Sequence, residues 1–243
     1  MKPQNKIHRI FLRIDFNKTK YVCPSDISHR ILNVLRIKES EKLVIFNHKK
    51  EQCYASIKKE NKKVIIIIEN QFKDNQSMLK NIHLSVSVIN MKNMDLIIQK
   101  AAELGVNEFY PIYTKRSQYS DVSKKIIHWD KISVHASEQC SRIDIMKIKQ
   151  PITLSDYISQ EDSVNSYVLH QKGTSFSFDE LDKKEISILV GPEGGFDTSE
   201  LELLKESDWK FKNISQNILR TETACISALS IINNYEGLSR HNI

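Results

Sequence analysis

The chain has 243 residues, of which 40% are hydrophobic and 27% are charged. This composition is typical of a soluble globular protein with one large domain or two ordinary ones. No apolar run approaches the roughly 20 residues that span a bilayer, and no signal-peptide core follows Met1, so we expect a cytoplasmic protein without a membrane partner. Cys23, Cys53, Cys140 and Cys225 are far apart, and the eight histidines show no ligand spacing, so we expect inert thiols and no metal site.

The positive charge is concentrated in the first third of the chain. Residues 1–75 hold 17 Lys and Arg against 8 Asp and Glu, a net charge of +9, whereas residues 76–243 hold 19 against 22, a net charge of −3. A basic module beside a slightly acidic one suits an RNA-anchoring domain attached to a catalytic domain, because phosphate neutralisation supplies most non-specific affinity for RNA. A lysine-rich solvated surface explains the same charges, so both interpretations stay open here.

The N-terminal third is predicted to be a small β domain with one helix. Short runs rich in β-branched and aromatic residues predict strands at 7–14, 43–46, 52–57 and 64–69. After the first run, Ser25 is predicted to cap a helix, with Pro24 just before the cap. The apolar residues of this helix recur at helical spacing: Ile27, Ile31, Val34 and Leu35. Several short strands suggest a small barrel, and the polar stretch 71–81 is the expected linker between domains 1–75 and 76–243.

From residue 82 the pattern changes to alternating strands and helices. Alternating or short apolar runs predict strands at 82–88, 109–113, 167–170, 186–190 and 211–215. Helical periodicity predicts one helix that ends at Gly105, a long helix with Trp129 on its apolar face, and two more helices at 198–207 and 221–235. This succession predicts an α/β fold with a largely parallel sheet.

Two loops in this second part carry the strongest functional signals. Three of the six glycines lie within residues 190–196, Val-Gly-Pro-Glu-Gly-Gly-Phe, where they let backbone N–H groups approach a ligand closely. Residues 214–223, Ile-Ser-Gln-Asn-Ile-Leu-Arg-Thr-Glu-Thr, again link an apolar run to a helix. Loops at the ends of neighbouring strands are where open α/β sheets usually bind ligands. Neither loop has the pattern of a P-loop or of a dinucleotide-binding fingerprint.

Two helix starts have capping chemistry. Asp197 precedes Glu200 by three residues, as in a capping box, and Thr221 is the predicted N-cap of the last helix. Glu222 then lies at the positive end of the helix dipole, so its role can be purely structural. The last helix also has an apolar stripe, suited either to the core or to a dimer partner, made of Ala224, Ala228, Ile231, Ile232 and Tyr235.

Six blocks resemble, in order, the RsmE family of SPOUT RNA methyltransferases, which use S-adenosylmethionine to methylate N3 of a uracil in small-subunit (16S) ribosomal RNA. The blocks lie at residues 29–36, 99–106, 115–117, 137–142, 191–196 and 218–224. The resemblance implies a SPOUT domain with a trefoil knot, a small N-terminal PUA-like β-barrel and a homodimer. The chain departs from the family pattern at Ser215, where glycine is common, and at Asn217, where a basic residue is common.

The resemblance also implies the site residues. The expected contacts of S-adenosylmethionine are Leu169, His170, Val190, Gly191, Glu193, Gly195, Ile214, Ser215, Ile218, Leu219 and Ala224. Arg220 is the residue type that would stabilise the anion formed when the uracil loses its N3 proton, with Arg142 and Arg116 as helpers. Glu138 and Glu222 are the candidate carboxylates for handling that proton or for orienting those arginines. The expected RNA contacts are Arg9, Arg13, Arg30, Arg36 and Arg116.

Other functions stay open from the sequence. A SPOUT methyltransferase that acts on another RNA target, such as a ribose 2′-hydroxyl, would carry the same loops. An RNA-binding ribosome assembly factor that has lost its activity would keep the fold, although the intact Gly-Pro-Glu-Gly-Gly and Arg-Thr-Glu-Thr segments argue against it. A metal-dependent hydrolase is the weakest alternative, because the histidines lack ligand spacing.

Overall fold

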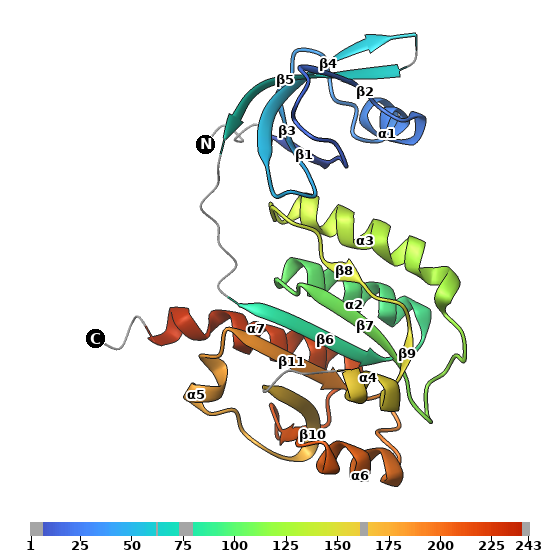
Figure 1. Cartoon of the computed structure of the whole chain (residues 1–243), viewed down its shortest axis with the longest axis vertical. Coiled ribbons are helices and arrows are strands. Elements are labelled where there is room, and N and C mark those ends of the chain that lie inside the picture. The colour runs from blue at the N-terminus through green and yellow to red at the C-terminus, as the bar shows by residue number, and fades with distance from the viewer. Residues whose placement is uncertain (1–6, 62, 73–79, 161–164, 240–243) are drawn as a thin grey trace. The chain divides into compact units, whose positions relative to one another are not determined.

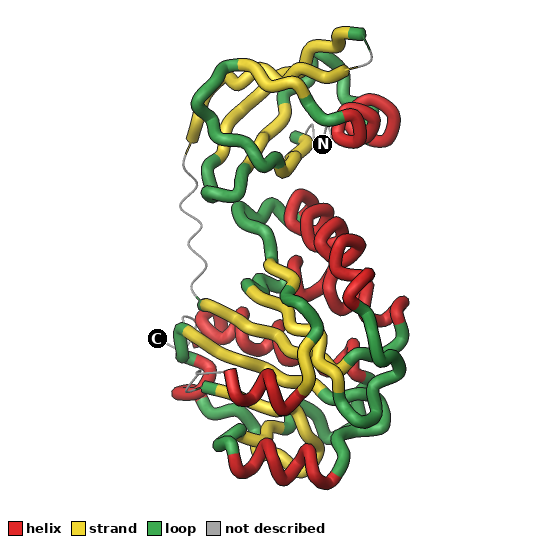
Figure 2. Tube along the Cα trace, turned by 45° about the vertical axis from the view of Figure 1, so that its right-hand side comes forward, coloured by secondary structure: helices red, strands yellow, loops and turns green. Residues whose placement is uncertain are grey.

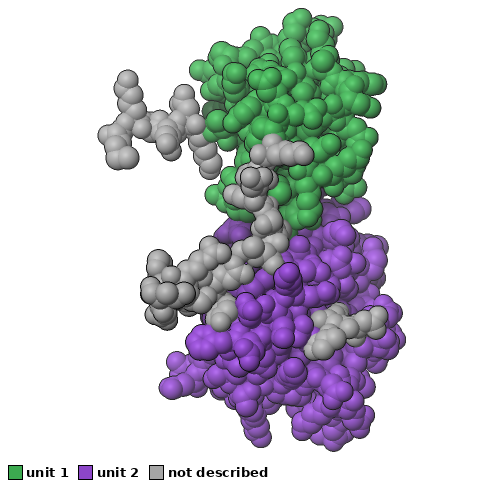
Figure 3. Space-filling view, turned by 60° about the vertical axis from the view of Figure 1, so that its left-hand side comes forward, with its two compact units in different colours: residues 1–77, 137–145 green, residues 78–136, 146–243 purple. Residues whose placement is uncertain are grey.

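The computed structural model describes residues 7–61, 63–72, 80–160 and 165–239, the last six of these as backbone alone (Figure 1). The chain forms two compact units, one made of Met1–Ser77 with Ser137–Ile145 and the other of Met78–Ala136 with Met146–Ile243 (Figure 3). The sequence had placed residues 137–145 in the C-terminal domain. Their membership of the first unit depends on contacts with residues more than 80 positions away, which leave no local pattern.

The first unit is built on one five-stranded sheet. Its strands are β1 (His8–Phe11), β2 (Lys20–Val22), β3 (Leu43–Phe46), β4 (Gln52–Glu60) and β5 (Lys63–Phe72). They pair in the order β1-β3-β4-β5-β2, with β1 and β3 parallel and the other pairs antiparallel. The bounds of β3 are as predicted, β1 is shorter, β4 and β5 are longer, and the sequence missed β2. In β4, Cys53, Ala55 and Ile57 are buried in the core at the two-residue period of a strand.

The predicted N-terminal helix is α1 (Ser25–His29), which continues as a π-helical turn, η1 (Arg30–Val34). The predicted cap is wrong, because Pro24 holds the N-cap position, Ser25 is the first helical residue and no side chain caps the helix. The π turn is wider than an α turn, so the predicted apolar stripe does not stay on one face. Ile31 is fully buried, whereas Val34 is exposed.

The second unit holds a seven-stranded sheet in which all the described strand pairs are parallel. Its strands are β6 (Asn81–Ser87), β7 (Glu108–Tyr113), β8 (Lys147–Ile148), β9 (Ile152–Thr153), β10 (Ser166–Thr174), β11 (Glu185–Val190) and β12 (Lys210–Lys212). They run in the order β12-β10-β11-β6-β7-β8, and β9 also pairs with β7. The prediction of an α/β fold with a largely parallel sheet is confirmed.

Helices cover both faces of this sheet (Figures 1 and 2). They are α2 (Met91–Glu103), the 3-10 turn η2 (Ser123–Lys125), α3 (Ile126–Gln139), α4 (Leu154–Gln160), α5 (Phe178–Leu181), α6 (Thr198–Glu206) and α7 (Thr221–Ser239). One core lies between the sheet and α2, α3 and α7, and a second lies between the sheet and α4 and α6. In β11, Ile186 and Ile188 enter the first core and Leu189 enters the second. Burial on both faces explains why the strand reads as a continuous apolar run.

Several helix ends follow the predicted chemistry. Gly105 lies just beyond α2 with φ of +83°, and Asp197 and Glu200 form the capping box of α6. The prediction of Thr221 as an N-cap is wrong, because the Arg220 carbonyl accepts the first helical bond of α7 from Ala224 N–H at 2.9 Å. The Thr221 hydroxyl instead donates to the Gly191 carbonyl, in the loop after β11.

Two further predictions concern segments between elements. The predicted strand 211–215 is too long, since β12 ends at Lys212 and the next residues turn away. The expected linker overlaps the end of β5 and the start of β6, and its residues 73–79 lie outside the described part of the chain.

Candidate functional site

A cavity opens where the regular pairing of β10 with β11 and β12 ends. β10 pairs with β11 up to Leu169 and Val190. Its register against β12 is regular up to Leu169 and Lys212 and then shifts, so that Thr174 also pairs with Lys212. The cavity has a volume of about 440 Å³. All eleven residues expected to contact the cofactor line it. Eight more residues line the cavity that were not among the expected cofactor contacts: Gln171, Pro192, Gly194, Phe196, Lys212, Asn213, Asn217 and Thr221.

The glycine-rich segment after β11 forms one wall of the cavity. A Cβ on Gly191 would lie 2.9 Å from a ring carbon of Phe196, so only glycine lets that ring close the wall. Gly195 has φ of +70°, a conformation that a side chain disfavours, and it brings the chain to the start of α6. The Gly194 carbonyl accepts a hydrogen bond from the guanidinium of Arg116, which comes from the loop after β7.

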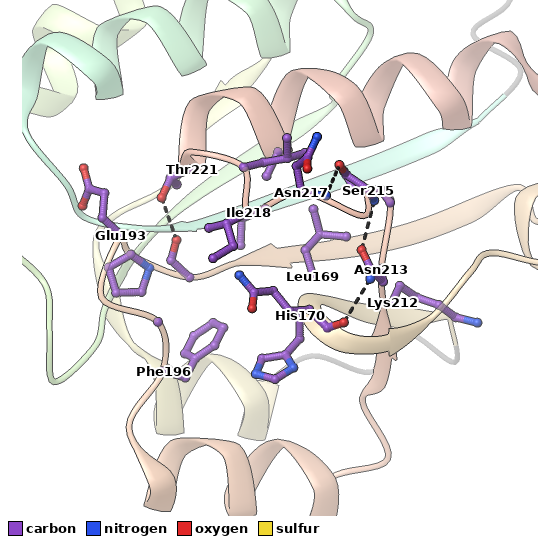
Figure 4. Close-up of a pocket in the computed structure, with 18 of the residues that line it drawn as sticks. Leu169, His170, Glu193, Phe196, Lys212, Asn213, Ser215, Asn217, Ile218 and Thr221 are labelled. Carbon is purple, nitrogen blue, oxygen red and sulfur yellow. Dashed lines mark hydrogen bonds between the residues drawn. The ribbon is translucent and has the colours of Figure 1, made fainter.

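The segment after β12 is held by bonds between side chains and backbone (Figure 4). Asn213 Oδ1 accepts the Ser215 N–H at 3.0 Å, and Ser215 Oγ accepts the Asn217 N–H at 3.0 Å. The Thr221 hydroxyl donates to the Gly191 carbonyl at 3.0 Å, which joins this segment to the glycine-rich one. Such local bonds replace the strand hydrogen bonds that the sequence had predicted here.

His170 contributes an uncharged ring to the cavity. Its Nδ1 accepts the Lys172 N–H at 3.1 Å, which assigns the proton of the neutral ring to Nε2. Burial lowers the pKa of His170, and the nearby positive charges of Lys172 and Lys205 lower it further. The ring therefore stays neutral near pH 7 and adds no positive charge to the cavity.

Arg220 and Glu222 lie beside the cavity rather than in its lining. Arg220 is exposed just before α7, and its guanidinium forms no hydrogen bond or ion pair with the residues that the structure describes. Glu222 lies in the first turn of α7, where one carboxylate oxygen is buried and has no hydrogen-bond partner among the described residues. Burial first, and then the Glu222 charge, raise the pKa of Cys225. No ion pair joins the Arg220 and Glu222 side chains in the part of the chain that the structure describes.

Glu138 and Arg142 belong to the first unit, whereas Arg220 and Glu222 belong to the second. The buried Glu138 carboxylate binds the Arg30 guanidinium and accepts the Phe11 N–H at 2.9 Å. Arg142 donates from Nε to Asp144 at 2.7 Å. Burial alone would raise the pKa of Asp144, but the charge and hydrogen bond of Arg142 hold that pKa below its ordinary value. Glu138 and Arg142 thus have partners within their own unit.

The four N-terminal arginines fall into two pairs. Arg9 donates to Gln52 Oε1 at 2.8 Å and lies over the Phe46 ring, and Arg30 binds Glu138. Arg13 and Arg36 are exposed and form no ion pair with the described residues. Arg36 also has φ of +54°, which is uncommon outside glycine. Only the second pair has free cationic groups for a polyanion.

Comparisons with known proteins agree with this geometry. An RNA methyltransferase domain family matches residues 75–233 of the chain. Ribosomal RNA small subunit methyltransferase E of Aquifex aeolicus is 33% identical over 83% of this chain and 89% of its own, and that of Buchnera aphidicola (Schizaphis graminum) is 30% identical over 94% and 96%. The chain belongs to the ribosomal RNA small subunit methyltransferase E family. The family resemblance seen in the sequence is confirmed.

Solved structures of similar proteins support the same membership. A methyltransferase from Legionella pneumophila, solved with bound S-adenosylmethionine, superposes with a TM-score of 0.87 at 27% identity and covers 93% of this chain and 97% of its own. Methyltransferase E from Neisseria gonorrhoeae, also bound to S-adenosylmethionine, gives 0.85 at 25% identity and covers 93% and 96%. This RNA methyltransferase chain therefore has the α/β fold of family members that were solved with their cofactor.

The eight other lining residues differ in the signal that they left in the sequence. Asn217 and Thr221 lie inside residues 214–223, the second of the two loops with functional signals. Pro192, Gly194 and Phe196 stand inside the glycine-rich block and could have been included with it. Asn213 carried a turn signal, because a short amide after an apolar run often bonds to its own backbone. Gln171 and Lys212 carried no local signal, since only the pairing of distant strands brings them to the cavity.

Among the described residues, no group of three or more His, Cys, Asp or Glu could hold a metal ion. No helix in the described ranges is long and apolar enough to cross a membrane. Burial raises the pKa of Cys23 to about 11 and that of Cys53 to about 12, so these thiols are poor nucleophiles near pH 7.

Proposed function

We propose that this chain transfers a methyl group from S-adenosylmethionine to N3 of a uracil in small-subunit ribosomal RNA. The observation that carries the proposal is the three-walled cavity at the ends of β10, β11 and β12, in a chain of this family. Open parallel sheets bind ligands at this position because the loops that follow neighbouring strands converge there.

The cavity fits the cofactor in size and chemistry. A volume of about 440 Å³ is within the range of roughly 300–1,000 Å³ for sites that bury a ligand of this size. Leu169, Ile214 and Leu219 offer apolar walls for adenine, while the glycine-rich segment offers backbone donors and acceptors. A neutral His170 offers an N–H group without repelling the positive sulfonium. When bound, S-adenosylmethionine supplies an electrophilic methyl group on that sulfonium.

Arg220 and Glu222 are the proposed catalytic pair. The neutral uracil N3 is a poor nucleophile, so the site must favour the anion that remains when N3 loses its proton. Arg220 is exposed beside the cavity and has no partner among the described residues, which leaves its guanidinium available for a uracil oxygen. The partnerless Glu222 oxygen is an acceptor for the N3 proton or for Arg220 once RNA is present. We infer that Glu138 and Arg142 support the first unit instead.

We propose that residues 1–75 form a PUA-like barrel that binds RNA and that residues 76–243 form a knotted SPOUT domain. Support for the first part is its net charge of +9 and the exposed Arg13 and Arg36. Support for the second is the match of residues 75–233 to an RNA methyltransferase domain family and the parallel sheet that this part forms.

We also propose a homodimer formed through the surface near the cavity. Of the predicted α7 stripe, Ala228 and Ile232 are fully buried in the core of their own unit and Ala224 packs against it, whereas the side chain of Tyr235 lies outside the described part of the structure. Ile231 remains 37% exposed, and Ile218 and Phe178 are 81% and 74% exposed. Large apolar side chains at such exposure suit a protein contact. Sedimentation showing only monomer at micromolar concentration would refute the dimer.

The decisive experiment measures the modified nucleoside. Small-subunit RNA from cells that lack the protein is incubated with purified enzyme and S-adenosylmethionine, then digested and analysed by mass spectrometry. We expect 3-methyluridine to appear with wild-type enzyme and not with the Arg220→Ala variant. A 2′-O-methylated nucleoside would refute the base-methylation assignment, and no modification despite measurable cofactor binding would refute the proposed activity.

A further inference from the structure

Asn213 connects two of the three walls of the cavity through its backbone and its side chain (Figure 4). Its side-chain Nδ2 donates to the Gln171 carbonyl at 2.9 Å, and its Oδ1 accepts the Ser215 N–H at 3.0 Å. Its own N–H donates to the Thr174 carbonyl at 2.8 Å. One side of the residue is thus bonded to β10 and the other to the turn after β12.

The two departures from the family pattern are bonded to one another in the same turn. Ser215 Oγ accepts the Asn217 N–H at 3.0 Å, directly after the bond between Asn213 and Ser215. Ser215 is not among the described residues with positive φ, so its position does not need the conformational freedom of glycine. Two successive side-chain-to-backbone turns therefore hold the segment where a glycine would leave it freer to move.

We propose that Asn213 is a positioning residue for S-adenosylmethionine, acting through the Gln171 and Ser215 backbones. This inference rests on the proposed function. Gln171, Ile214 and Ser215 all line the cavity, so the amide fixes the separation of two walls before the cofactor arrives. A wall that is already ordered costs no conformational entropy when the ligand binds, which strengthens binding without any new contact.

Asn165 offers a matched control at the other end of the same strands. Its Nδ2 donates to the Glu185 carbonyl at 3.1 Å, so it also links neighbouring strands through an amide-to-carbonyl bond. Asn165 precedes β10 and Glu185 begins β11, and neither residue lines the cavity. Loss of this bond tests the general cost of removing an interstrand amide, without touching the cavity segments.

The experiment compares Asn213→Ala, Asn213→Asp and Asn165→Ala with the wild-type full-length chain. Calorimetry measures the S-adenosylmethionine Kd, thermal unfolding measures stability, and turnover on small-subunit RNA gives kcat and the KM for the cofactor. Asn213→Ala loses both side-chain hydrogen bonds, and Asn213→Asp replaces the donor to the Gln171 carbonyl by a carboxylate oxygen that repels it. We expect either change to raise Kd and KM by about tenfold or more, with kcat within about threefold of wild type. Asn213→Asp keeps the size of the side chain and the Ser215 contact, so it decides the matter if the alanine variant does not fold.

The outcomes separate this inference from the proposed function. Asn165→Ala should bind the cofactor within about twofold of wild type, even if its unfolding temperature falls as far as that of Asn213→Ala. Equal weakening by the two alanine variants, or an Asn213 variant that binds normally, would overturn the positioning role alone. Wild-type protein that does not bind S-adenosylmethionine would overturn the proposed function and this inference with it.

Discussion

Gly173→Ala should destabilise the protein strongly, because β10 passes very close to β12 at this residue. The added Cβ would lie 2.5 Å from the backbone N and C of Lys212 and 2.6 Å from the backbone C of Phe211. All three contacts are with backbone atoms, so no side-chain rotation relieves them. The two strands must move apart by about 0.5 Å merely to reach the closest contacts seen for real Cβ atoms.

The expected loss of folding stability in Gly173→Ala has two components. Overpacking of a close contact typically costs about 1–3 kcal/mol. Separation also weakens the bond from Asn213 N–H to the Thr174 carbonyl at 2.8 Å, which is worth about 1 kcal/mol. A total of about 3 kcal/mol should lower the unfolding temperature by about 6–12 °C in a chain of this length. Cofactor affinity should fall as well, since both strands carry walls of the cavity.

Circular dichroism during heating measures the effect, and Gly194→Ala provides the control. A Cβ on Gly194 would lie 3.3 Å from the Arg116 Cδ, which belongs to a flexible side chain that can move away. That variant should unfold within about 2 °C of wild type. If Gly173→Ala unfolds as close to wild type as the control does, the reasoning from the backbone crossing is wrong.

Three further changes test the electrostatic assignments. Arg220→Ala should lower kcat roughly 100-fold while the S-adenosylmethionine Kd stays within a few fold, and a parallel collapse of both would contradict the assigned role. Burial alone would raise the pKa of Glu108, but hydrogen bonds from Lys149 and a tyrosine lower this pKa to about 2. The ionised Glu108 carboxylate therefore contributes fully to folding stability above pH 4.5, and this contribution is lost as the pH falls to 2. Glu108→Gln should make the free energy of unfolding depend less on pH between pH 4.5 and 2. If the variant loses stability over this pH range as steeply as wild type does, the assignment to Glu108 is wrong. Replacing Arg13 and Arg36 together by Ala should weaken RNA binding and reduce its salt dependence by up to about two counterions, whereas an unchanged salt slope would show that neither contacts phosphate.

The repeating patterns of the sequence predicted the second unit well because its strands and helices are regular. The capping box at Asp197 and the positive φ at Gly105 are local features, and both were predicted correctly. Local features led to a wrong prediction where another local interaction was more favourable. Pro24 rather than Ser25 holds the N-cap position of α1, and the side-chain turns at Asn213 and Ser215 end β12 earlier than its apolar run implied.

The sequence by itself determined the α/β class, the parallel sheet, the family and the residues around the cavity, because each depends on periodicity or on a contiguous block. Only the tertiary structure decided how those blocks meet. Thr221 bonds Gly191 thirty residues away, and Asn213 bonds Gln171 across two strands, so neither link has a sequence pattern. It also decided the partners of Glu138, which are Arg30 and Phe11, more than 100 residues earlier in the chain. A charged residue in a family block looks the same whether it faces a substrate or a structural partner, and only its contacts in the folded chain tell these apart.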